Sequence, residues 1–465
     1  MTHLINRLQF EFNCTDEDQA FNFRQNFETT FQGQIIDAAD KICSNHVHED
    51  EWINIEKLEI DLGTFSPAAF YSNFSLVFKS KFEKALINKL SNISSSEKKE
   101  SLGVSRTALL TYFLQAGSLP WWAGEQEINL NEIILELIAN QPATIISFLY
   151  RHQTNQNLWI RIAFQLSDEV KTKLILSINE LKAAEKLFLK WIEQLNILSK
   201  HESVTQSSVA QNMIDDIVLK NAPQIFQNAN GENILLEILE KSIATISTHA
   251  TSAITKIFLE NKSLFIENPS EATGSTNENI SNALDVRYLT TQTGDEELVI
   301  EKYIVKHAGI ILLSAFLKAF FTNLQLLNHK EWKNKDAQYK AVHLLKFLST
   351  GKQEMFEYNL TLEKIMCGLA IEEPVPIDVL LEEYETNEAI QLLESVIEHW
   401  KALKNTSVNG LRESFLKRDG ILTRNENGWL LQVERKTLDV LIDSIPWGYN
   451  TIAFSWSEDL IFVEW

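Results

Sequence analysis

The sequence predicts a predominantly helical α+β protein with a small N-terminal α/β module, a central helical region and a C-terminal helical domain that ends in short antiparallel strands. Three observations favour this fold class. Apolar residues recur every three or four positions over most of the chain, two short runs near the N-terminus alternate with period two, and the segment 429–462 alternates again. With 465 residues, 45 % of them hydrophobic, the chain can bury a sizeable core.

The N-terminal module is predicted to run strand, helix, strand, helix. Residues 8–12 and 53–62 alternate apolar and polar side chains, as half-buried strands do. Apolar residues over 20–42 form one stripe of a long amphipathic helix. Ser66 and Pro67 then supply the N-cap and first-turn proline of a second helix. The apolar face of this helix carries residues spaced by four: Phe70, Phe74, Phe78, Phe82 and Leu86.

Polar segments divide the rest of the chain. The stretch 91–105 is rich in serine and has the composition of a linker, and 267–297 is the clearest break because Asn, Thr, Ser and Glu dominate it. We therefore predict an N-terminal α/β module at 1–92, a central helical spacer with polar hinges at 106–266, a linker at 267–297 and a C-terminal domain at 298–465.

The C-terminal domain is predicted from two kinds of pattern. An almost wholly apolar stretch over 304–327 predicts one buried helix. Alternating residues at 429–433 and 452–462 predict strands, with turns at 425–428 and 446–448. Further helices are expected at 339–348, 360–369 and 378–404.

The charge balance excludes several classes of partner. Lys and Arg number 42 against 63 Asp and Glu, a net charge of −21, and no basic face is apparent. Duplex DNA and anionic membrane surfaces both require such a face, so neither nucleic acid nor membrane is expected as a partner. Three scattered cysteines are too few for a disulfide framework, and no signal peptide is visible, so we expect a cytoplasmic protein.

Common catalytic motifs are absent from the sequence: it has no Walker A loop, nucleophile elbow, His-Glu-x-x-His or Cys-x-x-Cys. Cys43, His46 and His48 could hold zinc, but their spacing is irregular, and a polar turn is the favoured interpretation. His343 lies on an apolar helix and is predicted as a core or boundary histidine, which is favoured over a general base. The acidic residues of 372–398 predict a solvated helix face. We predict no enzymatic activity, no cofactor and no metal, and an unusual hydrolase or metal enzyme is the least favoured alternative.

The C-terminal tail is crowded with aromatic residues. Two interpretations stay open. The tail completes the core of a small sheet, or it forms a docking surface, because Trp and Phe are enriched at interface hot spots. The candidate protein-interaction residues are Trp447, Trp456, Phe462 and Trp465.

Several segments at both ends carry a family resemblance. The N-terminal ones are INRLQFEF (5–12), DEDQAFNFRQNF (16–27) and EDEWINIEKLEIDLG (49–63). The C-terminal ones are HAGIILLSAFLKAFF (307–321), KAVHLLKFLSTG (340–351), NTSVNGLRESFLKRDGIL (405–422), GWLLQVERKTLDVLIDSIPWGYNTIAFSW (428–456) and LIFVEW (460–465). In this order they resemble the tape measure protein family of contractile injection systems, the bacterial phage-tail-like particles that puncture target cells.

This resemblance implies a non-enzymatic assembly role. Such a protein is thought to sit on the baseplate hub, occupy the lumen of the growing tube and set where polymerisation stops. The implied partners are the inner tube and the baseplate hub or spike proteins, with a homo-oligomer left open. The implied location is the cytoplasm during assembly, with retention in the lumen of the released particle as a further option. The alternative function is a helical adaptor or chaperone of the same particle that binds cargo, tube or baseplate subunits.

The central region does not have the pattern of a continuous rod. As one helix, residues 106–290 would span about 280 Å at the α-helical rise. No heptad repeat is sustained, and prolines interrupt the region at Pro120, Pro142, Pro223 and Pro269. Two interpretations stay open: an extended string of helices that is stretched during assembly, or length control that does not follow simple helix arithmetic.

Overall fold

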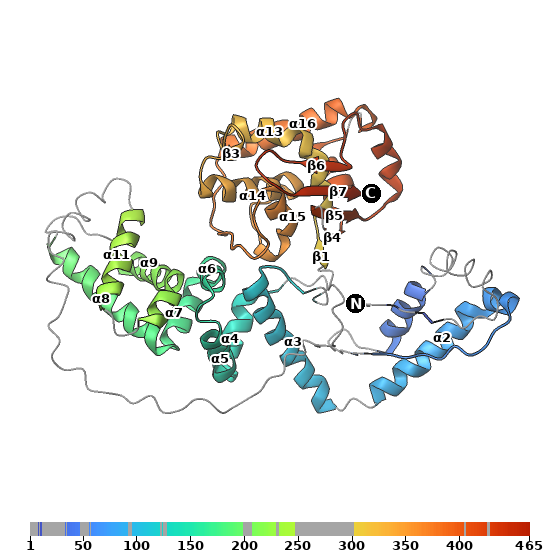
Figure 1. Ribbon diagram of the computed structural model, residues 1–465, viewed down its shortest axis with the longest axis horizontal. Helices are drawn as coiled ribbons and strands as arrows, with labels where there is room; N and C mark the ends of the chain where they lie inside the picture. The colour runs from blue at the N-terminus through green and yellow to red at the C-terminus, as the bar shows by residue number, and fades with distance from the viewer. Residues whose placement is uncertain are drawn as a thin grey trace. The chain divides into compact units, whose positions relative to one another are not determined.

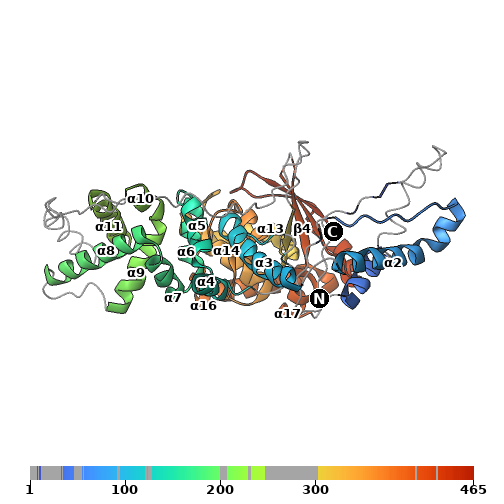
Figure 2. The ribbon, with the colours of Figure 1, turned by 90° about the horizontal axis from the view of Figure 1, so that it is seen from below.

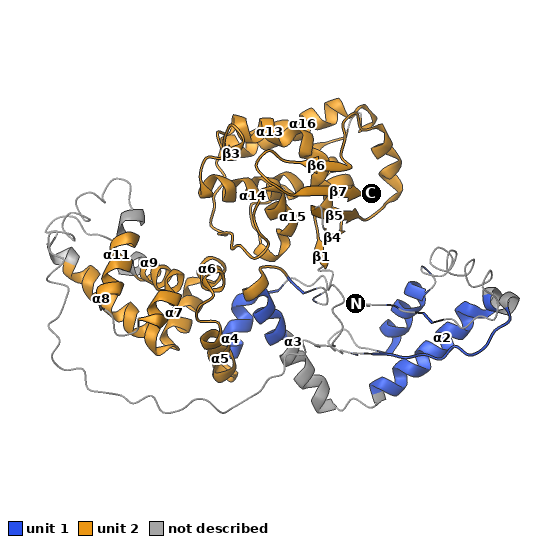
Figure 3. Ribbon diagram, viewed as in Figure 1, with its two compact units in different colours: residues 1–113, 119–137 blue, residues 114–118, 138–465 orange. Residues whose placement is uncertain are grey.

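The chain is described by a computed structural model that divides it into two compact units. Unit 1 comprises residues 1–113 and 119–137, and unit 2 comprises 114–118 and 138–465 (Figure 3). The predicted four-part division of the chain stays a prediction. The described residues are 8, 10–11, 33, 35–46, 55, 57–91, 95–120, 123, 128–198, 207–228, 232–246, 302–403, 406–425 and 428–465.

Unit 1 contains the long helix that the sequence predicts after Ser66. Helix α2 (Pro67–Ser91; Figure 1) begins at the predicted proline, and its predicted apolar face is buried from Phe70 to Leu86. Its phenylalanine rings follow one another at centroid distances of 4.9, 5.8 and 5.5 Å. Residues 35–46 are also helical, and Ile35, Ala38 and Ile42 pack into the same core. The four-residue spacing was therefore sufficient to identify this interface.

The two strands predicted for the N-terminal module are wrong over their described residues. Residues 57–62 and residues 8, 10 and 11 form no strand, although Leu58, Ile60 and Leu62 pack against the α2 core as their alternation suggests. A strand requires a hydrogen-bonded neighbour, which a period-two pattern does not guarantee. Helix α3 (Ser95–Ala116) then runs through most of the segment 91–105 that composition marks as a linker. Glu and Lys in that segment are good helix formers.

The central part of unit 2 is a series of short helices, in agreement with the helical pattern of the sequence. Pro142 and Pro223 lie in the first turns of their helices, where a proline has no hydrogen bond to lose. These prolines therefore start helices. In both Figure 1 and Figure 2, α8, α9 and α11 lie side by side. The helices are α4 (Leu130–Asn140, shared with unit 1), α5 (Pro142–Arg151), α6 (Gln156–Gln165), α7 (Asp168–Leu176), α8 (Asn179–Leu198), α9 (Ser207–Lys220), α10 (Ala222–Gln227) and α11 (Glu232–Ile246).

The C-terminal part of unit 2, residues 302–465, combines helices with a five-stranded sheet in the order β1-β4-β5-β7-β6. Its strands are β1 (Lys302–Val305), β4 (Gly420–Asn425), β5 (Gly428–Val433), β6 (Thr451–Ala453) and β7 (Leu460–Glu464), with a separate pair of β2 (Leu327–Asn328) and β3 (Glu331–Trp332). Its helices are α13 (Ser314–Asn323), α14 (Lys335–Thr350), α15 (Thr361–Met366), α16 (Glu383–His399) and α17 (Val408–Leu411). Shorter helical turns are η3 (Ala308–Leu313), η4 (Glu357–Asn359), η5 (Lys401–Leu403), η6 (Arg412–Leu416) and η7 (Thr437–Ser444). The predominantly helical α+β fold class is confirmed.

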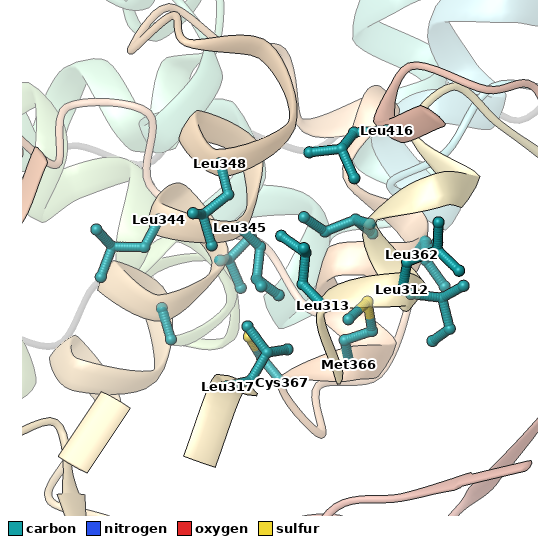
Figure 4. Packing of buried hydrophobic residues seen from close by; sticks show 14 of the residues in the cluster. Leu312, Leu313, Leu317, Leu344, Leu345, Leu348, Leu362, Met366, Cys367 and Leu416 are labelled. Atoms are coloured by element: carbon teal, nitrogen blue, oxygen red, sulfur yellow. The ribbon is translucent and has the colours of Figure 1, made fainter. Parts of the chain in front are cut away.

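Leucines from several helical segments lie together in the core of this part (Figure 4). Leu312, Leu317 and Leu345 are each at most 1 % exposed. Because the side chains are closely packed, removing even one methylene group from this core should lower stability. The other labelled residues of the cluster are Leu313, Leu344, Leu348, Leu362, Met366, Cys367 and Leu416.

The single buried helix predicted over 304–327 is wrong. This apolar stretch begins in strand β1, continues through the 3-10 turn η3 and only then becomes α13. In β1 the side chains alternate between solvent and core, and Gly309 lies against the backbone of Phe415, where an added Cβ would be 1.7 Å from the carbonyl oxygen. The helix ends before Gln325, whose φ of 55° is left-handed. All three elements contribute residues to the core, so the apolar composition did not separate them.

The strands are also not all antiparallel. β7 runs parallel to β5, with Leu431 opposite Val463, while the other strand pairs are antiparallel. The chain leaves β5 through η7 and β6 before it returns as β7, and this long connection lets the two strands run in the same direction. The helices predicted at 339–348, 360–369 and 378–404 correspond to α14, to the shorter α15 and to α16, which begins only at Glu383 behind a capping box.

His343 is buried in α14, which confirms its predicted place in the core, and it should make stability depend on pH. Its side chain is 3 % exposed, and its Nε2 donates to the Pro376 carbonyl oxygen at 2.8 Å. Burial lowers the pKa of His343 to about 4, against about 6.5 in an unfolded chain. Protons then bind the unfolded state first, so stability falls as the pH drops from 6.5 to 4, by about 3 kcal/mol in total.

The pH effect of His343 can be measured by urea unfolding at several pH values. The variant His343→Gln keeps an amide donor but cannot titrate. Comparison with it separates the pH effect of His343 from the pH effects of the carboxylates. Between pH 6.5 and 4, the free energy of unfolding should fall by about 3 kcal/mol less in the variant than in the wild type. Identical pH profiles would contradict the prediction.

Candidate functional site

The three tryptophans of the predicted interaction tail are bound into the C-terminal core. Each is partly buried, and each donates its indole N–H within the domain. Trp447 donates to the Leu312 carbonyl oxygen at 2.9 Å, and Trp456 donates to the Met366 carbonyl oxygen at 2.9 Å. Trp465 donates to Asp439 Oδ2 at 3.0 Å. A tryptophan that is fixed in this way contributes to folding, because its ring is packed and its only donor is satisfied.

Phe462 differs from the tryptophans because it lies on the other face of the sheet. In β7 its neighbours Ile461 and Val463 are buried, while Phe462 is only half-buried and lies opposite Leu430 of β5. On the same outer face, Ile304 and Ile421 form a cross-strand pair, each with 43 % of its surface exposed. The structure therefore does not bring the four candidates together on one surface. Their role in protein interaction stays a prediction.

A second candidate site is a buried ionic junction that connects α6 to the C-terminal part of unit 2. Arg161, in the middle of α6, is fully buried, and its Nε donates to both carboxylate oxygens of Glu357 at 3.2 Å. Its Nη1 donates to the Leu114 carbonyl oxygen at 2.6 Å, and its Nη2 to that of Glu372 at 2.5 Å. Leu114 lies in the last turn of α3, so the guanidinium also satisfies a carbonyl that the helix leaves open. We call this group, with Lys364 and Gly117 below, the Arg161 junction.

Lys364 completes the charges of the junction. Its Nζ donates to Glu357 Oε1 at 2.5 Å and to the Ile371 carbonyl oxygen at 2.9 Å, and both charged side chains are fully buried. Burial lowers the pKa of Lys364, and the Glu357 carboxylate opposes this shift. One carboxylate thus lies between two cations, and backbone carbonyls accept further N–H groups of both cations, which is how buried charges are compensated.

Gly117 leaves the space that the Arg161 side chain occupies. Its φ of +71° is left-handed, and a Cβ at this position would be 2.4 Å from Arg161 Nη2 and 2.8 Å from the Ile371 carbonyl oxygen. A larger residue therefore meets both backbone strain and a clash with the guanidinium.

A neighbouring buried network joins two further elements to α15, the helix that carries Lys364. His307 Nδ1 lies 3.0 Å from Glu363 Oε1, and Lys346 Nζ lies 3.2 Å from His307 Nε2. Since the ammonium can only donate, Nε2 accepts and Nδ1 donates to the carboxylate. Burial lowers the pKa of Lys346, and Glu363 opposes this shift. The network links the start of η3 to α14 and α15.

The clusters that the sequence offered as metal or catalytic alternatives have structural partners. His46 Nε2 lies 2.8 Å from Glu83 Oε1 of α2, burial raises the pKa of Cys43, and His48 lies outside the described residues. On α16 most carboxylates are exposed, as predicted, but Glu385 is buried and accepts from Lys340 at 2.8 Å. Within the described part of the chain, no group of three or more His, Cys, Asp or Glu residues could hold a metal ion.

The Arg161 junction was missed by sequence reasoning, although one signal pointed to it. Arg161 interrupts the apolar run Leu-Trp-Ile-Arg-Ile-Ala-Phe at 158–164, where a charge on a buried face requires a partner. The partner Glu357 is 196 residues away, and no pattern in the sequence identifies it.

The fold and these sites define a class: a helical α+β protein whose described buried charges pair with one another and connect its own elements. A family model described as contractile injection system tape measure protein matches residues 2–465. The chain therefore belongs to the contractile injection system tape measure protein family, which is a family of structural proteins. No curated protein and no solved structure matches the chain. No single helix in the described residues is long and apolar enough to cross a membrane, and one bent pair, α4 with α5, passes that test together.

Proposed function

We propose that this protein sets the length of the tube and sheath in a contractile injection particle. The observation that carries the proposal is the family match over residues 2–465, which includes the central helices as well as both ends. We propose the inner tube and the baseplate hub or spike proteins as its partners. Assembly would take place in the cytoplasm, and the protein would then occupy the tube lumen.

The central helices offer a physical basis for a ruler. From α5 to α11 the chain is divided into short helices of 6 to 20 residues. Breaks between such helices let a chain be drawn out without unwinding each helix. A string of helices gains about 1.5 Å per residue, whereas a fully extended chain gains about 3.3–3.6 Å. The number of residues then determines the length.

Adding a second copy of α8 should lengthen the particle. We expect an insertion of its 20 residues after Leu198, at the start of the polar stretch 199–212, to extend the sheath by about 30 Å if the chain is helical in the tube. An extension of about 70 Å would instead indicate a fully extended chain. Electron microscopy of purified particles measures the difference and decides between the two interpretations of the central region.

The control for this insertion keeps the number of residues constant. Lys186→Gln with Glu193→Gln changes two exposed positions of α8 without altering the chain length, and should leave the sheath unchanged. Sheaths of wild-type length from the insertion variant would refute the ruler role.

A helical adaptor or chaperone of the same particle is a second candidate function. The observation that favours it is the apolar outer face of the sheet, where Ile304, Ile421, Leu430 and Phe462 lie on neighbouring strands. An adaptor of this kind would bind a tube or baseplate subunit without setting sheath length.

A further inference from the structure

The Arg161 junction closes a long loop of the chain. The guanidinium and the Glu357 carboxylate lie 3.2 Å apart, although 196 residues separate them in the sequence. While this contact holds, Arg161 and Glu357 stay together, so the residues between them add nothing to the length that the protein spans. The same residues laid out as one helix would span about 290 Å.

The junction is built to be either fully closed or fully open. Its charged side chains are completely buried, so withdrawing Glu357 would leave two buried cations without a counter-charge, and withdrawing Arg161 would deprive the carbonyls of Leu114 and Glu372 of this donor. Gly117 lies so close to the guanidinium that even an added Cβ would clash with it, so the junction is tightly packed on this side. Tightly packed interfaces of this kind switch between discrete arrangements and do not deform gradually.

A contact one turn further along α6 holds the same two parts together. Gln165, 7 % exposed, donates its Nε2 to the carbonyl oxygen of Val375, which is fully buried, at 2.8 Å. Arg161 and Gln165 are four residues apart and therefore lie on one face of α6. This face is held by the segment 371–375, whose Ile371 and Glu372 carbonyls also belong to the junction.

We infer that the Arg161 junction is a latch that keeps the free protein compact and opens when the chain is laid along the tube. The inference rests on the proposed function, since a length-setting protein must convert folded residues into distance. While the latch is closed, the residues between 161 and 357 do not contribute to the length that the protein can set. Opening the latch releases them in one step.

A covalent lock across the junction tests this inference. Gln165→Cys with Val375→Cys introduces one thiol on each of the two segments that this contact joins, and non-reducing electrophoresis shows whether the thiols are joined by a disulfide or, failing that, by a short bis-maleimide. In particles assembled from the full chain in cells with an oxidising cytoplasm, the locked protein should give shorter sheaths or at least a tenfold lower particle yield. For the disulfide form, reductant added before assembly should restore both the sheath length and the particle yield.

Two comparisons make the result specific. The single variant Gln165→Cys cannot be locked and should behave as wild type under both conditions. In the free protein, Arg161→Gln should raise amide hydrogen exchange in α6 at least tenfold. Full-length sheaths at normal yield from the locked protein, or unchanged exchange in Arg161→Gln, would overturn the latch. The α8 insertion separates this failure from that of the ruler, because it must still change sheath length if only the latch is wrong.

Discussion

Replacing Arg161 with methionine should destabilise unit 2 by about 3–5 kcal/mol, because one partner of a buried ion pair is removed and the other stays. Methionine keeps most of the volume but cannot donate to Glu357 or to the carbonyls of Leu114 and Glu372. The two carbonyls would then lose this donor in a buried site, and Glu357 would keep only Lys364 as a cationic partner. Urea unfolding, together with hydrogen exchange in α6 and α15, measures the loss.

An exposed ion pair in the neighbouring helix provides the matched control. Lys173 pairs with Glu169 on α7, and the two side chains are 49 % and 67 % exposed. Lys173→Met should cost less than about 1 kcal/mol, because water screens the pair. Equal losses of unfolding free energy for Lys173→Met and Arg161→Met would show that burial of the junction contributes nothing to stability.

A triple variant shows what the junction contributes beyond packing. With Arg161→Met, Glu357→Leu and Lys364→Met no uncompensated charge remains, so part of the stability should return. Recovery should be incomplete, since the carbonyls of Leu114, Ile371 and Glu372 would still lack their donors.

Removing residues 456–465 should abolish cooperative folding of the C-terminal part of unit 2. The deletion removes β7, which lies between β5 and β6 in the sheet, together with two of the indole donors. Loss of an internal strand breaks two strand interfaces at once. Circular dichroism and hydrogen exchange should report an unfolded sheet. A folded sheet after truncation would contradict the central position of β7.

Because truncation should unfold the domain, it does not test the tail as a docking surface. Phe462 and Val463 provide a cleaner comparison, since they are adjacent on β7 but face opposite sides. Val463→Ser should cost about 2–3 kcal/mol because it removes core contacts and buries a hydroxyl. Phe462→Ser should cost less than about 1 kcal/mol while weakening capture of a tube or baseplate subunit, if the adaptor function holds. Equal losses of stability would place Phe462 in the core.

The parts of the fold that depend on local pattern were predictable. The apolar face of α2 follows from its four-residue spacing, and the N-terminus of that helix from Ser66 and Pro67, because both signals act within a few turns of helix. Strand β5 likewise follows from the alternation of Trp429, Leu431 and Val433.

The remaining features depend on contacts between distant residues. The division of 304–327 into β1, η3 and α13 is set by pairing with β4 and by the approach of Phe415 to Gly309. Neither contact leaves a periodic signal in the stretch itself. The parallel pairing of β5 with β7 depends on the path of the chain between them. The Arg161 junction joins four separate segments, so its charged residues are informative only once the fold is known.

The position of β7 has a consequence for synthesis of the chain on the ribosome. β7 is the last of the five strands to be translated, yet it lies inside the sheet. A nascent chain that has not passed Leu460 leaves β5 and β6 as unpaired edges, which are prone to join with other chains. The sheet can close only after translation has passed this strand. A chain released early therefore lacks a finished C-terminal region, so incomplete chains differ from finished ones in fold as well as in length.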